Sequence, residues 1–226
     1  MKKLMILGFL IIGLVYLVCF PVSAASIGSP ETQGKGEFAL GVESEVVFDR
    51  DFEKIDNLYP EIDKMYRGYS KLSYGIFDNW DIYVKLGIVD PLIKVNSFEF
   101  DGRNSFLYGG GTKITYDLCN DWLIGTDLQY LTHKNKYCVG KMRFEEWHVA
   151  PYIARKINNF TPYLGVKYSD MRVKIKNPAG KTNLKAKDNF GVFAGADYKI
   201  NEDMLLNLEG RFIDETAMSI AFTYKF

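Results

Sequence analysis

The chain has 226 residues, of which 47% are hydrophobic, 15% aromatic and 25% charged, with 28 basic and 28 acidic side chains. This length suits one large domain or two small ones with a substantial core, and the neutral balance excludes a strongly basic nucleic-acid binder and an acidic disordered tail. No stretch after residue 24 approaches the roughly 20 apolar residues of a transmembrane helix, which excludes a bundle of such helices.

The first 24 residues have the pattern of a secretory signal peptide. Two lysines precede an apolar run over residues 4–20, and Pro21 and the small residues 22–24 follow it. A basic start, an apolar middle and a small-residue end are typical of such peptides. The apolar run is longer than usual, so an uncleaved anchor is the alternative. We expect cleavage after Ala24, which leaves residues 25–36 as an N-terminal periplasmic segment ahead of a single domain over 37–226.

From residue 37 onward the chain alternates apolar and polar residues, which is typical of strands with chemically different faces. The row Ile82, Val84, Leu86 and Ile88 is a clear example. We expect about ten strands, although 8 or 12 would also fit. They lie near residues 37–48, 66–77, 81–89, 104–117, 122–132, 143–156, 162–175, 188–200, 204–213 and 217–226.

Two kinds of break alternate between these strands. The short breaks carry Asn or Asp, which favour tight turns; they are residues 78–79, 120–121, 158–159 and 201–203. The longer breaks are polar and cover residues 49–65, 90–103, 133–142 and 176–187, whereas the last break, 214–216, is short and fits the pattern poorly. A repeat of roughly 40 residues also suggests propeller blades, but a blade needs four short strands where this sequence has two long ones.

Short turns at one end and long loops at the other predict an all-β fold: a closed, antiparallel, up-and-down transmembrane β-barrel. Ten residues at about 3.3 Å each, tilted by about 45°, cross roughly 23 Å of bilayer. The sheet must close because an unpaired backbone group in lipid costs several kcal/mol. An even strand number places both termini on the short-turn, periplasmic side. A secreted β-sandwich is the alternative.

The last strand carries the most specific signal. Phe222, Tyr224 and the terminal Phe226 occupy every second position. This resembles the C-terminal strand of bacterial outer-membrane β-barrel proteins, and the chain is similar to the small outer-membrane protein A-like and opacity-type barrels. The resemblance implies a place in the outer membrane, lipid as a partner, and these three residues as a signal for the barrel-insertion machinery. It leaves the extracellular partner of the loops unknown.

If the apolar rows face lipid, the intervening rows face the lumen. They carry six acids, Glu43, Glu45, Asp127, Glu146, Asp197 and Glu209, and six bases, Arg67, Lys71, Lys85, Lys113, Lys167 and Arg211. Buried charges persist only when they are paired, whereas an ion-selective pore more often carries a ring of one sign. We therefore expect a mostly plugged, salt-bridged lumen; charges solvated in a wet lumen are the alternative.

These features predict a structural or surface-interaction role. The second candidate is a narrow channel for small solutes, and the third is a hydrolase at the extracellular rim, with Asp49, Asp51 and His133 as its residues. We expect no enzyme, because neither these residues nor the inward His148 form a recognisable catalytic set. Nor do we expect a metal site, a cofactor or a nucleic-acid partner, since two histidines and two separated cysteines give no ligand spacing.

Two further motifs have structural interpretations. Gly109–Gly111 lie within a strand and lack the order of a nucleotide-binding loop, so we expect close packing there. Cys119 in a short turn and Cys138 in a long loop lie at opposite ends of a strand roughly 36 Å long. A disulfide needs Cα atoms within about 7 Å, so we predict two free thiols.

Overall fold

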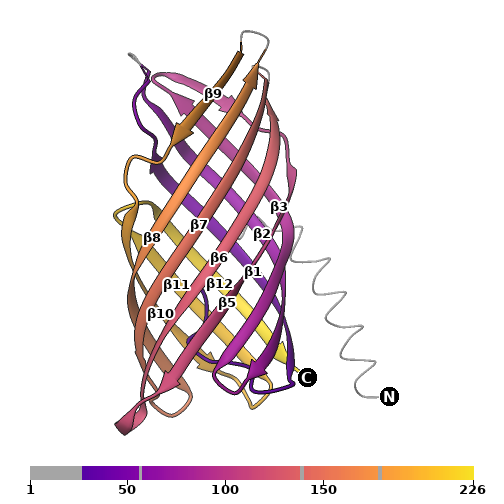
Figure 1. Cartoon of the computed structure of the whole chain (residues 1–226), viewed down its shortest axis with the longest axis vertical. Coiled ribbons are helices and arrows are strands. Elements are labelled where there is room, and N and C mark those ends of the chain that lie inside the picture. Colours follow the sequence, from indigo (N-terminus) through magenta and orange to yellow (C-terminus); the bar gives the residue numbers. More distant parts are fainter. Residues whose placement is uncertain (1–26, 56–57, 138–139, 178–179) are drawn as a thin grey trace.

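Ten long strands form the wall of an antiparallel barrel (Figure 1). The computed structural model describes residues 27–55, 58–137, 140–177 and 180–226, so the predicted signal peptide lies outside the described residues. The barrel strands are β1 (Phe38–Asp51), β2 (Pro60–Phe77), β3 (Trp80–Val95), β5 (Ser105–Asp117), β6 (Trp122–Tyr137), β7 (Gly140–Arg155), β8 (Phe160–Asn177), β10 (Phe190–Lys199), β11 (Met204–Phe212) and β12 (Thr216–Lys225). Two short strands, β4 (Phe98–Asp101) and β9 (Gly180–Lys185), extend hairpins at one end.

The barrel closes through its first and last strands. β1 pairs with β12, and the amide of Phe226 donates to the carbonyl of Phe38 at 2.9 Å. β8 pairs with β10 past the short β9 hairpin, so each barrel strand has two neighbours. The predicted closed antiparallel barrel of ten strands is confirmed. Closure removes the unpaired sheet edges that lipid does not tolerate.

The short turns lie at the end of the barrel that also holds the C-terminus (Figure 1). Asn120, Asp121 and Asn158 have positive φ angles of 60°, 64° and 54°. Asn and Asp adopt this backbone conformation more readily than other non-glycine residues. The turn chemistry expected from the sequence therefore appears in the structure, and it marks the periplasmic end of the barrel. No helix among the described residues is long and apolar enough to cross a membrane.

An apolar belt surrounds the half of the barrel next to these turns. Ile82, Val84, Leu86 and Ile88 on β3 point outward and are 43–50% exposed. We define the belt as the outward residues of 38–48, 66–77, 80–88, 106–116, 122–130, 147–153, 160–168, 190–198, 204–212 and 218–226. About nine residues per strand at about 3.3 Å each, tilted by about 45°, give a belt of roughly 20 Å, which suits the hydrocarbon of an outer membrane.

Several strands continue beyond the belt, and their outward residues there are charged and no longer apolar. On β6, His133 and Asn135 are buried while Lys134 and Lys136 are exposed. β2 and β8 reach 18 residues each. The expectation of long loops at 49–65, 90–103, 133–142 and 176–187 was wrong for this reason, because much of these segments is strand. The outer faces of these strand ends are charged, so the outward apolar rows that predict strands in the sequence are missing there.

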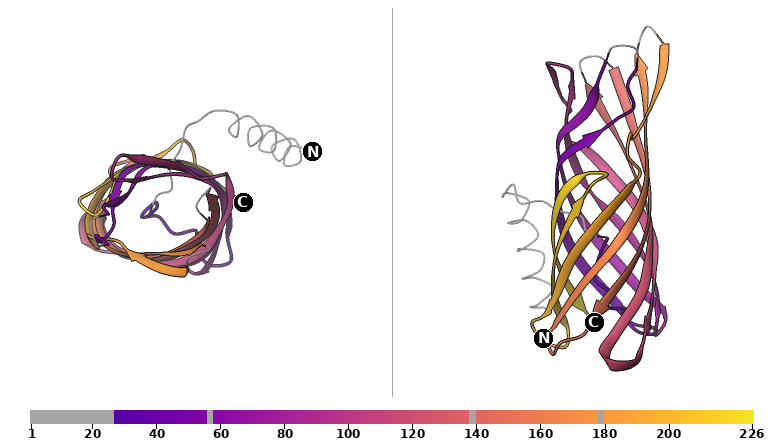
Figure 2. Two further views of the ribbon diagram at one scale, coloured as in Figure 1. Left: turned by 90° about the horizontal axis from the view of Figure 1, so that it is seen from above. Right: turned by 90° about the vertical axis from the view of Figure 1, so that its left-hand side faces the viewer.

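This extracellular extension covers only part of the circumference. β10, β11 and β12 have 10, 9 and 10 residues and end at the upper limit of the belt. In Figure 2 (right) the yellow strands stop well below the top of the violet and orange ones. The turn Ile213–Glu215 joins β11 to β12 at this low edge, with Ile213 at a φ of 84°.

Candidate functional site

The N-terminal segment lies inside the barrel at its periplasmic end. Figure 2 (left) shows this indigo stretch within the ring of strands, and Ile27 is only 1% exposed. The sequence predicted residues 25–36 as a periplasmic segment without assigning them a place in the lumen. We name the described part, residues 27–36, the lumen segment.

Backbone and side-chain hydrogen bonds hold the lumen segment to the wall. The Lys113 ammonium donates to the carbonyls of Ser29 (2.9 Å) and Glu31, and the Thr115 hydroxyl donates to that of Pro30 at 2.8 Å. The amide of Gln33 donates to the Asp81 carboxylate at 3.1 Å. An extended segment without secondary structure must satisfy its polar groups in this way when it is buried.

The same segment satisfies two carboxylates that have no close basic partner. Glu209 accepts from the amides of Ile27 (2.9 Å) and Gly28 (3.3 Å) and from the Tyr163 hydroxyl (3.0 Å). Asp197 accepts from the Ser29 hydroxyl at 2.5 Å and from an asparagine, Asn207, at 2.6 Å. The buried acids of the described residues are Glu43, Glu45, Asp81, Asp127, Glu146, Asp197, Glu209, Asp214 and Glu215; the corresponding bases are Arg50, Arg67, Lys71, Lys85, Lys113, Lys167 and Arg211. Nine acids thus face seven bases, and the lumen segment supplies donors for the surplus.

A network of arginines and carboxylates crosses the middle of the lumen. Glu45 on β1 accepts from Arg67 on β2 at 3.1 Å, from Arg211 on β11 at 2.6 Å and from the Tyr69 hydroxyl at 2.9 Å. Arg67 also reaches Glu146 on β7 at 2.8 Å. Bonds from β1, β2, β7 and β11 therefore meet at the centre of the barrel.

The network continues to the low edge of the barrel. Arg50 bonds Glu146 and donates to Glu215 at 2.9 Å, and Lys167 lies 3.0 Å from Asp214 and also bonds Glu215. The β11–β12 turn thus folds two carboxylates inward onto bases of other strands. Their partners secure this turn at the level where the wall is lowest.

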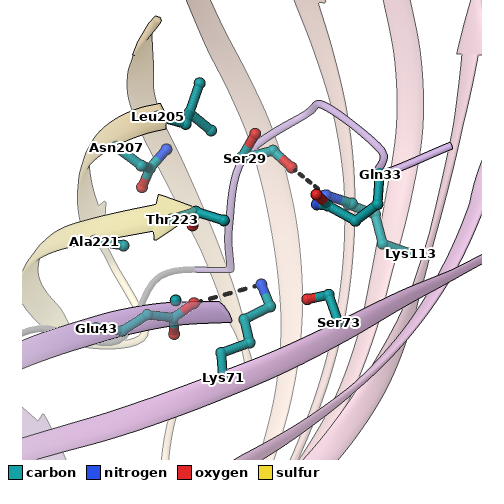
Figure 3. A pocket seen from close by; sticks show the side chains of 11 residues that line it. Ser29, Gln33, Glu43, Lys71, Ser73, Lys113, Leu205, Asn207, Ala221 and Thr223 are labelled. Carbon is teal, nitrogen blue, oxygen red and sulfur yellow. Dashed lines mark hydrogen bonds and ion pairs between the residues drawn. The ribbon is translucent and has the colours of Figure 1, made fainter. Parts of the chain in front are cut away.

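A second group of charges lies nearer the periplasm. Glu43 pairs with Lys85 at 2.7 Å and with Lys71 at 3.4 Å, and Asp127 accepts from the Tyr83 hydroxyl at 2.7 Å. Figure 3 shows Glu43 and Lys71 on one side of a small cavity, with Ser29 and Lys113 on the other. The cavity measures about 20 Å³, which is room for about one water molecule.

Apolar side chains fill the lumen above the charges. The cluster joins inward residues of the extension, among them Ile62, Met65, Leu107, Phe144 and Met171, each at most 1% exposed. His133 lies at this level, and its ring stacks on Phe144 with centroids 4.4 Å apart. The polarity of the barrel wall therefore inverts at the membrane surface, with charges inside the belt and apolar groups inside the extension.

The structure brings together the twelve charges that the sequence placed inward. Eleven are buried, and the side chain of the twelfth, Lys71, is 13% exposed. Sequence reasoning missed Arg50, Asp81, Asp214 and Glu215. Arg50 stands between two aspartates in a predicted loop, and a β-bulge after Val47 shifts its face. The poorly fitting break at 214–216 was the one signal that pointed to the β11–β12 turn.

The residues suggested for a rim hydrolase lie in different places, the two aspartates on the outer surface and the histidine inside the barrel. Carboxylate oxygens of Asp49, Asp51 and Glu61 lie within 4.8 Å of one another, and Lys187 pairs with Asp51 at 2.7 Å. Burial, and then the charge of Asp51, raise the pKa of Asp49. His133 instead is 2% exposed, and its Nδ1 donates to the Oδ1 of Asn135, 2.6 Å away, inside the barrel. His148 is also buried, 2.9 Å from Glu146, so neither ring faces the rim acids from the outside.

The remaining motifs have simple places. Gly109–Gly111 lie within β5, where a Cβ atom at Gly111 would come within 2.4 Å of the Tyr83 hydroxyl. Cys119 has an exposed free thiol. Cys138 lies outside the described residues, so the prediction of two free thiols stays a prediction.

Comparison with known proteins supports the architecture. No protein-family model and no curated relative matches the chain. Among solved structures, an outer-membrane channel from Pseudomonas putida F1 is similar with a TM-score of 0.52 and 7% identity, over 89% of this chain and 100% of that one. The translocator domain of the autotransporter NalP from Neisseria meningitidis has a TM-score of 0.51 and 10% identity, over 85% and 88%. These likenesses show the fold of bacterial outer-membrane β-barrels. A closed barrel with an apolar belt is the form in which strands cross such a membrane, and the chain is an integral outer-membrane barrel.

Proposed function

We propose that this barrel has a structural and surface-interaction role and that its lumen is sealed. The single observation that carries the proposal is that three different fillings follow one another along the lumen. They are the lumen segment at the periplasmic mouth, the ion-pair network at the centre and the apolar cluster inside the extension. Each spans the barrel from wall to wall through contacts between non-neighbouring strands.

The central layer supports the proposal most strongly. Buried ions that lose a partner cost about 3–5 kcal/mol, so opening a path between Glu45, Arg67 and Arg211 is costly. Buried charges of both signs on facing strands also differ from the single-sign rings of ion-selective pores. Buried ion pairs that link several strands are therefore better explained by closure and rigidity than by conduction.

Single-channel recording in planar bilayers tests the proposal. We expect the mature barrel to give no steady conductance steps. A variant lacking residues 27–36 should be equally silent, because the two upper layers remain. A well-characterised open porin, reconstituted in parallel, controls for insertion. Steady steps from the intact barrel would instead support a narrow channel for small solutes.

The last strand supports a second element of the proposal, entry into the membrane through its aromatic row. Phe222 and Tyr224 continue the outer row of β12, since Ala217, Ser219 and Ala221 at the alternate positions before them are buried, and Phe226 follows the strand at 52% exposure. Deleting Phe226 should lower the yield of inserted barrel, measured as the heat-modifiable band of outer-membrane fractions. A variant with Phe38→Ala, which alters the neighbouring strand on the same face, serves as the control and should insert normally.

A further inference from the structure

The outer face of the extension carries an unusual gathering of bases over β6–β9. We name this the basic face; its exposed bases are Lys134, Lys136, Lys141, Arg143, Arg172, Lys174, Lys176 and Lys185. Acids on the same strands are few. Glu145 accepts from Lys174 at 2.5 Å and lies 3.7 Å from Arg143, and Asp170 bonds Arg172 at 2.6 Å. Among the described residues, no ion pair reaches Lys134, Lys136, Lys141 or Lys176.

These bases stand directly opposite one another across the strands. Lys136 pairs in register with Lys141, which in turn pairs with Lys176. One step nearer the membrane, Lys134 stands opposite Arg143, and Arg143 opposite Lys174. Side chains in such positions have Cβ atoms about 4.5–5.5 Å apart, and like charges there destabilise the sheet. The barrel thus keeps an unfavourable arrangement that an external anion would relieve.

The height of the basic face identifies the anion. Trp147 and Tyr168 end the apolar belt on β7 and β8, at 51% and 42% exposure, and aromatic residues of this kind mark the membrane interface. Two residues further along each strand the charged positions begin with Glu145 and Asp170, which pair with the first bases of the basic face, Arg143 and Arg172. The basic face therefore starts just beyond the apolar belt, at the level of the lipid headgroups of the outer leaflet.

The rest of the extension has the opposite character. The outer residues of β1–β4 and their connections include Asp49, Asp51, Glu61, Asp63, Asp90, Glu99 and Asp101, with Lys54, Lys64 and Lys94 between them. The concentration of bases on β6–β9 is thus a local feature and not the general composition of the surface. It also gives the protein one side that attracts anionic headgroups and another that repels them.

We infer that the basic face binds the phosphate groups of the phosphorylated glycolipid in the outer leaflet. Lys and Arg form charge-assisted hydrogen bonds with phosphate oxygens, and each base near an anionic lipid surface adds to the attraction. The acyl chains of the same lipid would lie along the apolar belt below. The inference is independent of whether the lumen conducts.

The test uses the mature barrel in detergent micelles with bisphosphorylated lipid A as the probe. The main variant changes Lys134, Lys136, Lys141 and Lys176 to Gln. The matched control changes Lys54, Lys64, Lys94 and Lys187 to Gln, which removes the same charge at the same side of the membrane. Heat-modifiable migration on gels verifies that all three barrels are folded.

We expect the wild type and the control to bind the lipid equally, and the main variant to bind about tenfold more weakly or worse. Removing one phosphate from the lipid should weaken wild-type binding, and high salt should do so too. Without lipid, the main variant should be more resistant to urea than the wild type because like charges are removed; with lipid, the order should reverse.

Three results would overturn the inference. The first is unchanged lipid binding by the main variant, and the second is binding that ignores the phosphates. The third is self-association of the wild type that the main variant abolishes while lipid binding persists, since the basic face would then meet the acidic side of a second copy.

Discussion

Glu45 shows how much depends on single side chains in this lumen. Its carboxylate joins β1 to Arg67 on β2 and to Arg211 on β11, and all three groups are at most 2% exposed. Charges so deeply buried are stable only with their partners, because desolvation costs several kcal/mol per ion. Removal of one member therefore leaves the remaining buried ions with a desolvation cost that no partner offsets.

Replacing Arg67 by Ala should lower the free energy of unfolding by about 3–5 kcal/mol, because Glu45 and Glu146 both lose a partner. Urea unfolding in micelles, followed by gel migration, measures this. Lys156→Ala removes a solvent-exposed pair with Asp117 and should change the stability by less than about 1 kcal/mol. Equal effects of the two substitutions would contradict a central role for the network.

Asp90, beyond the belt on β3, gives a pH dependence of the extension. Burial, and then the charge of Asp101, raise its pKa above the ordinary 3.8. The folded state therefore holds the proton more tightly than the unfolded chain does. The resulting stabilisation is fully present below pH 3.8 and is lost as the pH rises through the folded pKa.

Asp90→Asn should accordingly make the barrel more stable than the wild type at pH 7 and equally stable at pH 3. The gain should stay below about 1 kcal/mol, because solvent screens this partly exposed group. Asp101→Asn should reproduce part of it. Urea unfolding at both pH values measures the difference, and a variant that is less stable at pH 7 would refute the assigned cause.

Neighbouring strands are fitted together by aromatic rings that lie over glycines. Cβ atoms added at Gly111, Gly125 and Gly195 would come within 2.4–2.5 Å of the hydroxyls of Tyr83, Tyr152 and Tyr163. Each ring extends from one strand across the next inside the lumen. The glycines thus make room for large side chains that fill a narrow barrel, and the hydroxyls then reach the buried polar groups.

Gly111→Ala should destabilise the barrel by about 1–3 kcal/mol, because the new methyl group overpacks against Tyr83. Gly68→Ala is the control, since nothing lies within 4 Å of a Cβ atom there. Urea midpoints of the two variants provide the comparison. A Tyr83→Phe, Gly111→Ala double variant that stays as unstable as Gly111→Ala would show that the obstacle is not the Tyr83 hydroxyl but the ring or the Leu128 carbonyl, whose oxygen lies 2.3 Å from the added Cβ atom.

The periodicity of the strands explains what could be predicted from the sequence. In β3 and β10 the outward rows are apolar, so strand, face and the inward Lys85 and Asp197 follow directly from the alternation. The end of β6 beyond residue 132 escaped because its outward residues there are Lys134 and Lys136. Arg50 escaped because a β-bulge breaks the period of two just before it. The height of an inward residue along the barrel decides whether it meets an ion or an apolar group. This height depends on strand tilt and register, which the alternation of residues does not give.

The position of the lumen segment inside the barrel bears on the removal of the predicted signal peptide. Ile27 is buried and its amide donates to Glu209, so the predicted leader ends three residues before a residue that is bonded inside the barrel. We expect the mature protein to begin at Ala25, which intact-mass measurement of the purified barrel would show. An Ala24→Leu substitution should leave uncleaved chains and reduce the heat-modifiable band. Retention of residues 1–24 in folded wild-type protein would contradict the expectation.

The burial of Ile27 also dictates where the protein tolerates foreign sequence. A peptide tag fused just ahead of residue 27 would adjoin a segment that is bonded inside the periplasmic half of the barrel, so antibodies on intact cells should not reach it. The tight turn at Asn96–Ser97, between β3 and β4, faces outward at the opposite end. An epitope inserted there would be displayed on the cell surface without disturbing the lumen segment, which makes that turn the natural grafting site of this barrel.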